Sequence, residues 1–150
     1  MSKDYRMKEL KKISNLLQVN PFSDLDLKYG FSGKSISSEE EKFFHHVKQV
    51  HGVGLVEACK KTEPGFSGER PMADALCTEE LGKIIAVKTA DCLPLLVSDS
   101  RKSFVAAIHA GWRGLSSGII SESLRFLVED KTDIKFEDIR VFMGPCLSFD

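Results

Sequence analysis

The chain has 150 residues, of which 42% are hydrophobic and 29% are charged, and its formal net charge is −1. These values are typical of one globular domain, and the balanced charge excludes a general field that attracts nucleic acid or an anionic membrane. No apolar stretch approaches the roughly 20 residues of a membrane span and no apolar signal core stands near residue 1, so we expect a cytoplasmic protein with reduced thiols.

Hydrophobic periodicity predicts both helices and strands along the chain. Apolar residues at helical spacing predict an amphipathic helix over residues 5–18, which ends before Asn20-Pro21. A Gly- and Pro-rich loop is expected over residues 62–71, and a second helical stripe begins at Leu115 and continues to Val128. Short apolar runs bounded by turn residues predict strands, at residues 29–33, 47–51, 53–58, 73–78, 84–88, 93–98, 104–109 and 139–143. The runs at 47–51 and 53–58 are either one strand bent at Gly52 or two strands joined there.

The predicted strands at 93–98 and 104–109 are apolar on both faces. This pattern is typical of central strands in a sheet that is covered on both sides. We therefore predict the α/β or α+β class, with a mixed β-sheet flanked by helices. Residues 1–28 are expected to form an N-terminal helix and linker, and residues 29–150 the main domain.

Three residues that can bind a metal stand at the ends of predicted strands, each beside a Gly, Asp or Pro. They are His51, Cys92 and His109. A catalytic zinc ion takes three protein ligands and leaves a fourth position for water, whose pKa falls to about 7. The competing interpretation is that Cys92 is a small buried hydrophobe, as unpaired cysteines commonly are. The spacing alone leaves both interpretations open.

Charged and aromatic residues flank these three. Arg113 lies in a Gly-Trp-Arg-Gly turn before the second helix, where its planar fork suits phosphate or carboxylate. Trp112 suits either stacking on a planar base or capping the core. Lys88, Asp91 and Asp74 are candidates for orienting a ligand or moving a proton. The remaining histidines and cysteines are expected to be structural: His45, His46, Cys59, Cys77 and Cys146.

Four motifs in order carry a resemblance to a known family. They are Gln49-Val50-His51-Gly52, Ala73-Asp74-Ala75-Leu76, Thr89-Ala90-Asp91-Cys92-Leu93-Pro94 and His109-Ala110-Gly111-Trp112-Arg113-Gly114. The chain resembles the laccase-domain proteins, also called the polyphenol oxidoreductase or purine nucleoside phosphorylase YfiH family, which includes peptidoglycan-editing-factor-like members. The resemblance implies an α/β fold similar to the catalytic domain of a cytotoxic necrotising factor. It also implies a metal site made of His51, Cys92 and His109.

The resemblance implies a zinc-dependent purine nucleoside enzyme. Expected activities are phosphorolysis of adenosine, inosine and methylthioadenosine, with possible adenosine deamination, and the expected partners are a nucleoside and phosphate rather than nucleic acid or membrane. Cys92, His109, Arg113 and Asp91 are the catalytic candidates. Alternatives are copper-dependent phenol oxidation and a cysteine hydrolase, in which Cys92 attacks an amide, such as one of a peptidoglycan precursor, with His109 as base.

The sequence also departs from the family pattern. The early glycine-rich block is reduced to residues 30–37, without its arginine or double glycine, and the sequence stops at Asp150, where family members continue. We therefore expect a domain that is incomplete at its C-terminal end. A homo-oligomer or a partner chain could supply the missing part, and a non-catalytic binding or assembly module is a further alternative.

Overall fold

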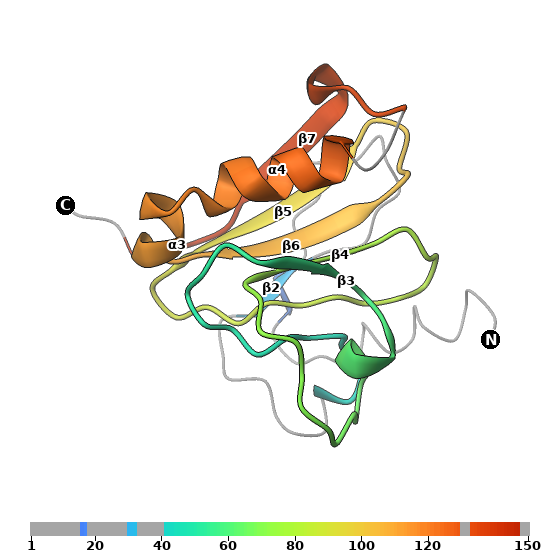
Figure 1. Ribbon diagram of the computed structural model, residues 1–150, viewed down its shortest axis with the longest axis vertical. Helices are drawn as coiled ribbons and strands as arrows, with labels where there is room; N and C mark the ends of the chain where they lie inside the picture. Colours follow the sequence, from blue (N-terminus) through green and yellow to red (C-terminus); the bar gives the residue numbers. More distant parts are fainter. Residues whose placement is uncertain (1–15, 18–29, 33–40, 130–132, 148–150) are drawn as a thin grey trace.

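A computed structural model describes residues 16–17, 30–32, 41–129 and 133–147 (Figure 1). In chain order, the elements are β1 (Leu16–Leu17), β2 (Phe31–Ser32), β3 (Leu55–Glu57), η2 (Lys60–Thr62), β4 (Ala75–Thr78), β5 (Leu93–Asp99), β6 (Val105–Ala110), α3 (Trp112–Ser116), α4 (Ile119–Glu129), η3 (Phe136–Asp138) and β7 (Ile139–Met143). The η elements are single 3₁₀ turns. The mixture of strands and helices confirms the predicted class.

One mixed sheet organises the described part of the chain. Its five strands lie in the order β3-β4-β6-β5-β7, with β3 parallel to β4 and the other neighbours antiparallel. The middle strand is β6, and β5 lies beside it, so the central positions predicted for these two strands are confirmed. β1 and β2 form a separate antiparallel pair.

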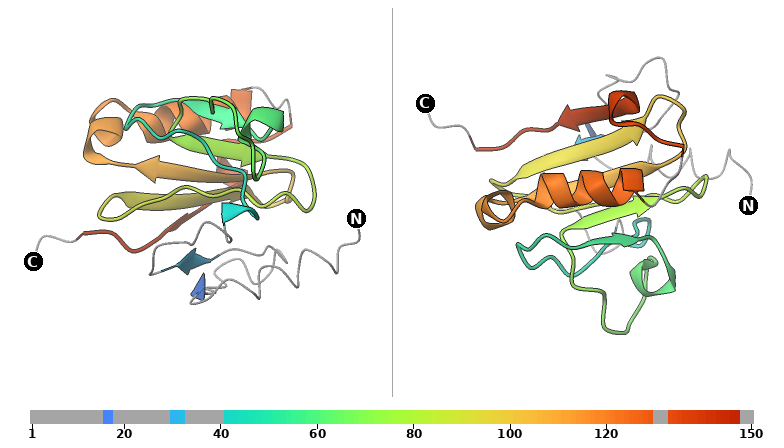
Figure 2. Two further views of the ribbon diagram at one scale, coloured as in Figure 1. Left: turned by 90° about the horizontal axis from the view of Figure 1, so that it is seen from below. Right: turned by 45° about the horizontal axis from the view of Figure 1, so that its top comes forward.

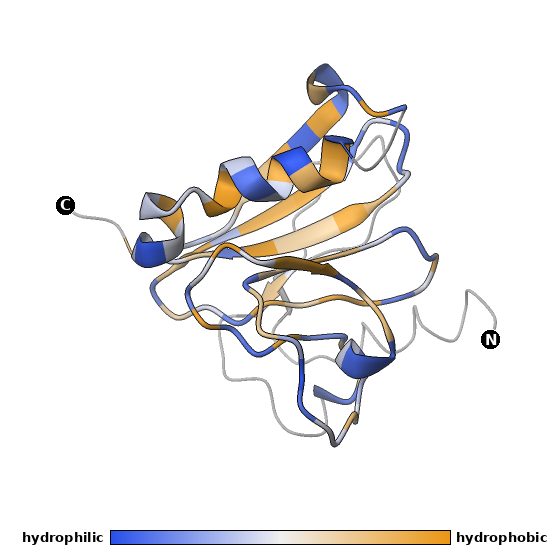
Figure 3. Ribbon diagram, in the orientation of Figure 1, coloured by the Kyte–Doolittle hydropathy of each residue, from blue (hydrophilic) through white to orange (hydrophobic). Residues whose placement is uncertain are grey.

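Helices α3 and α4 lie on one face of the sheet (Figure 2). Gly118 has a φ of +87°, a conformation that glycine adopts readily, and it divides the single predicted stripe into α3 and α4. The buried Ile119 and Leu127 of α4 pack against apolar side chains of the central strands, whose colour is that of hydrophobic residues in Figure 3. Each such fully buried side chain contributes about 1.5–3 kcal/mol relative to exposure. No helix among the described residues is long and apolar enough to cross a membrane.

Two of the predicted strands are wrong. Residues 47–51 and 84–88 form no ladder, only single parallel bridges between Lys48 and Met72 and between His45 and Ile85. At these bridges backbone groups still pair with backbone groups, but the N–H groups of Val50, His51 and Lys88 bond to side chains. The predicted helix over 5–18 lies outside the described residues except for Leu16–Leu17, which form strand β1; there the prediction is wrong, because pairing with β2 overrides the local helical periodicity.

Candidate metal centre

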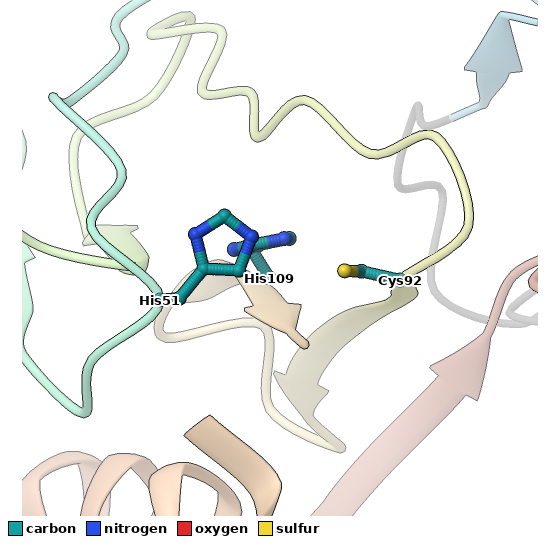
Figure 4. A group of neighbouring side chains, drawn as sticks. All are labelled: His51, Cys92 and His109. Atoms are coloured by element: carbon teal, nitrogen blue, oxygen red, sulfur yellow. The ribbon is translucent and has the colours of Figure 1, made fainter. Parts of the chain in front are cut away.

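The side chains of His51, Cys92 and His109 converge at one end of the sheet (Figure 4). Their potential ligand atoms all lie within 4.8 Å of one another. The two imidazole rings meet edge to face, with 4.8 Å between centroids and 84° between planes. The structure thus brings together residues that are distant in the sequence: Cys92 lies 17 residues before His109, and His51 lies 58 residues before it.

The register of two central strands explains why Cys92 and His109 meet. Pro94 lies opposite His109 and Leu93 opposite Ala110, so the next positions along the pair are Cys92 and Gly111. A Cβ at Gly111 would lie 3.0 Å from His51 Cδ2, 3.1 Å from Cys92 Sγ and 3.6 Å from His109 Cε1. The missing side chain of Gly111 therefore leaves the space in which the three ligands converge.

The donor set fits a metal ion. Two imidazoles and a thiolate suit Zn²⁺ and also copper. With metal–ligand bonds of about 2.0–2.3 Å, tetrahedral ligand atoms stand roughly 3.3–3.8 Å apart. The separations of up to 4.8 Å therefore require a contraction of about 1 Å around an ion, which small side-chain rotations can supply.

The carboxylate of Asp74 links both histidines to the sheet. Asp74 is fully buried immediately before β4. It accepts hydrogen bonds from His109 Nδ1 (2.8 Å) and from the backbone N–H groups of His51 (2.9 Å), Gly52 (2.7 Å) and Val50 (3.2 Å). Burial raises the pKa of the Asp74 carboxyl, but the His109 bond and the three backbone bonds outweigh it, and the pKa lies below its ordinary value.

A second side chain, Gln49, joins the His51 turn to the segment that leads to Cys92. Its Nε2 donates to the Lys88 carbonyl oxygen at 2.8 Å, and its Oε1 accepts from the Lys88 N–H at 2.7 Å. The amide thus replaces the ladder bonds that a strand at 84–88 would make. The Lys88 ammonium forms an ion pair with Glu41.

Arg113 and Trp112 begin α3, directly after Gly111, and both are exposed. The Arg113 guanidinium lies over the Trp112 ring, 5.3 Å from its centroid. Because Trp112 is 73% exposed, it does not cap the core. Asp91 is exposed beside Cys92, and its carbonyl oxygen accepts the Leu147 N–H. The catalytic roles of these residues stay predictions.

Two residues that shape the centre were not singled out from the sequence, Gln49 and Gly111. A signal was present in both cases, because Gln49 opens the Gln-Val-His-Gly motif and Gly111 follows His109 by two positions. Neither reveals its partner in the sequence. His45, expected to be structural, is buried with its Nδ1 3.1 Å from Thr62 Oγ1.

The sequence is similar to a known protein family and to several known proteins. A family model described as multi-copper polyphenol oxidoreductase laccase matches residues 32–150. Over 101 residues the chain is 37% identical to purine nucleoside phosphorylase YfiH of Shigella flexneri, and over 82 residues it is 39% identical to a purine nucleoside phosphorylase of Haemophilus influenzae. These alignments cover 67% and 55% of this chain, and 37% and 32% of the two relatives.

Two solved structures also match this chain over part of their length. Neisseria meningitidis protein NMB0706 superposes with a TM-score of 0.57 at 33% identity, covering 70% of this chain and 39% of the other. YlmD of Geobacillus stearothermophilus superposes with a TM-score of 0.61 at 29% identity, covering 71% and 40%. The chain therefore spans about a third to two fifths of the length of these proteins.

Proposed function

We propose that this chain, which belongs to the multi-copper polyphenol oxidoreductase laccase family, carries the metal-binding part of a purine nucleoside phosphorylase site. The observation that carries the proposal is the convergence of His51, Cys92 and His109 within 4.8 Å above the side-chain-free Gly111. The names of the relatives supply the reaction class, because several are purine nucleoside phosphorylases. We take Zn²⁺ as the ion and copper as the alternative.

A bound Zn²⁺ would supply a Lewis acid and lower the pKa of a water that it binds. The residues of the chain would hold and orient the reactants. Trp112 offers an exposed ring on which a purine can stack, and Arg113 offers a guanidinium fork for phosphate. Both groups follow Gly111 directly, so they stand at the rim of the proposed centre.

The proposed reaction is phosphorolysis. A phosphate oxygen forms a bond to ribose C1′, the C1′–N9 bond breaks, and the purine leaves with that electron pair and takes up a proton. The products are the free base and ribose 1-phosphate. Adenosine deamination is a second expected activity of the same centre, in which water replaces the 6-amino group and ammonia leaves.

The test combines metal analysis with base release. Protein purified without chelator should contain close to one zinc per chain, and Cys92→Ala and His51→Ala should each lose it. With zinc, inosine and phosphate, we expect hypoxanthine release that stops when phosphate is omitted. The same panel should include adenosine, methylthioadenosine and a phenol with copper. Full zinc occupancy without base release from any nucleoside would contradict the phosphorylase assignment.

A cysteine hydrolase is the second candidate, because one observation favours it. Asp74 accepts a hydrogen bond from His109 Nδ1, and the other side of that imidazole faces Cys92, which is the order of an acid, a base and a nucleophile. The two functions make different demands on His51. A hydrolase needs Cys92 and His109 but no metal, so amide hydrolysis that survives both chelation and His51→Ala would favour it.

A further inference from the structure

Asp74 occupies a position that the sheet fixes on both sides. Its backbone N–H donates to the Gly54 carbonyl at 2.9 Å, and its own carbonyl accepts the His109 N–H at 2.7 Å. The residue is fully buried. Its carboxylate therefore projects from a rigid part of the fold into the gap between the His51 turn and β6.

Both oxygens of the carboxylate accept hydrogen bonds, and one of them accepts from both histidines. Oδ1 accepts from His109 Nδ1 and from the His51 N–H, whereas Oδ2 accepts from Gly52 and Val50. A carboxylate can only accept, so Nδ1 of His109 carries a proton, and in the neutral ring Nε2 then keeps its lone pair. That lone pair is the one a metal ion would use.

The backbone bonds act on His51 in a different way. His51 has a φ of 60°, in the left-handed region, which costs a non-glycine residue about 1 kcal/mol or more. Three consecutive N–H groups, from Val50 to Gly52, converge on Asp74 and compensate for that conformation. The turn then presents the His51 ring to His109, edge to face.

We infer that Asp74 is the positioning residue of the metal centre, which fixes the tautomer of one histidine and the backbone of the other. The inference rests on the proposed metal site. It gives one buried carboxylate control over two of three ligands. Outer partners of this kind typically change metal affinity about 10- to 100-fold when they are removed.

The first experiment needs no variant. Nitrogen-15 NMR of the histidine rings in metal-free wild-type protein at pH 8 should show His109 protonated at Nδ1 and unprotonated at Nε2. The opposite tautomer would overturn the inference. Because the measurement uses the wild-type chain, it stands even where a substitution at Asp74 prevents folding.

The second experiment compares Asp74→Asn with Asp99→Asn. Asp99 is the matched control, since it is also fully buried and accepts the backbone N–H groups of Arg101 and Ser103, away from the ligands. In zinc titrations against a competing chelator, Asp74→Asn should bind about 10- to 100-fold more weakly than wild type, with a changed His109 nitrogen spectrum. Asp99→Asn should keep wild-type affinity and spectrum.

The outcomes separate this inference from the proposed function. Folded Asp74→Asn that binds zinc as tightly as wild type reduces Asp74 to a structural residue and overturns the inference. Wild-type protein that binds neither zinc nor copper overturns the proposed metal centre, and the tautomer from the first experiment then decides whether Asp74 orients His109.

Discussion

Replacing Gly111 with alanine tests whether the empty space at this position creates the metal centre. The added Cβ would stand 3.0 Å from His51 Cδ2 and 3.1 Å from Cys92 Sγ, closer than nine in ten such contacts in proteins. Both ligands would have to retreat by a few tenths of an ångström. The metal requires the opposite movement, because the ligand atoms must draw together by about 1 Å.

The substitution should leave folding almost unchanged. Gly111 has φ −72° and ψ 162°, which alanine adopts freely. Gly→Ala at a compatible position stabilises by about 0.4–1 kcal/mol through the unfolded chain, and displaced rotamers cost about 0.5–1.5 kcal/mol. These terms nearly cancel. Zinc affinity should instead fall about 10- to 100-fold, which corresponds to about 1.4–2.8 kcal/mol of binding free energy.

The assay measures zinc affinity by chelator competition and stability by denaturant unfolding of metal-free protein. Gly54→Ala is the matched control, because a Cβ there meets only ordinary contacts of 3.5 Å or more. It should keep wild-type affinity. The reasoning fails if Gly111→Ala binds zinc as tightly as wild type, or if its metal-free form is strongly destabilised.

Three other predictions concern single side chains around the centre. In metal-free protein, His51→Gly should be more stable than His51→Ala by about 1 kcal/mol, because glycine adopts φ 60° without strain; equal denaturation midpoints would contradict this. Gln49→Leu removes both hydrogen bonds to Lys88 and should weaken zinc binding in the same titration, whereas unchanged affinity would show that Gln49 does not position Cys92. Burial lowers the pKa of His46, and the positive charges of Arg70 and Lys88 lower it further. As the pH falls, the unfolded chain therefore takes up a proton at His46 near pH 6.5, before the folded chain does. Stability should fall as the pH drops below about 6.5 toward the lower folded pKa, and His46→Gln should flatten that slope in denaturant titrations; an unchanged slope would rule out His46 as its source.

The central strands could be predicted from the sequence because their apolar pattern depends on local burial. Residues 93–98 and 104–109 are apolar on both faces, and they became β5 and β6 with ends shifted by one residue at most. The strand at 139–143 agrees at both ends. The same pattern placed Cys92 and His109 at strand ends, and the antiparallel register then brings them together.

The regions that could not be predicted are those whose backbone pairs with distant side chains. Val50, His51 and Gly52 donate to a carboxylate 22 to 24 residues away, and Lys88 pairs with an amide 39 residues away. Both segments are apolar enough to predict strands. Periodicity reports which side chains are buried, but it contains no information on which groups satisfy the backbone.

The missing strand at 47–51 and the metal centre have one physical cause. In a regular strand, His51 would have an extended backbone and would point to the same face as Val47 and Gln49. Its φ of 60° turns the ring toward His109 instead, and this turn removes three N–H groups from any ladder. Backbone donors outside a ladder need other acceptors, and Asp74 is the acceptor for all three. Loss of the strand therefore follows from building the site, and a variant that restored a regular ladder at 47–51 would have to give up His51 as a ligand.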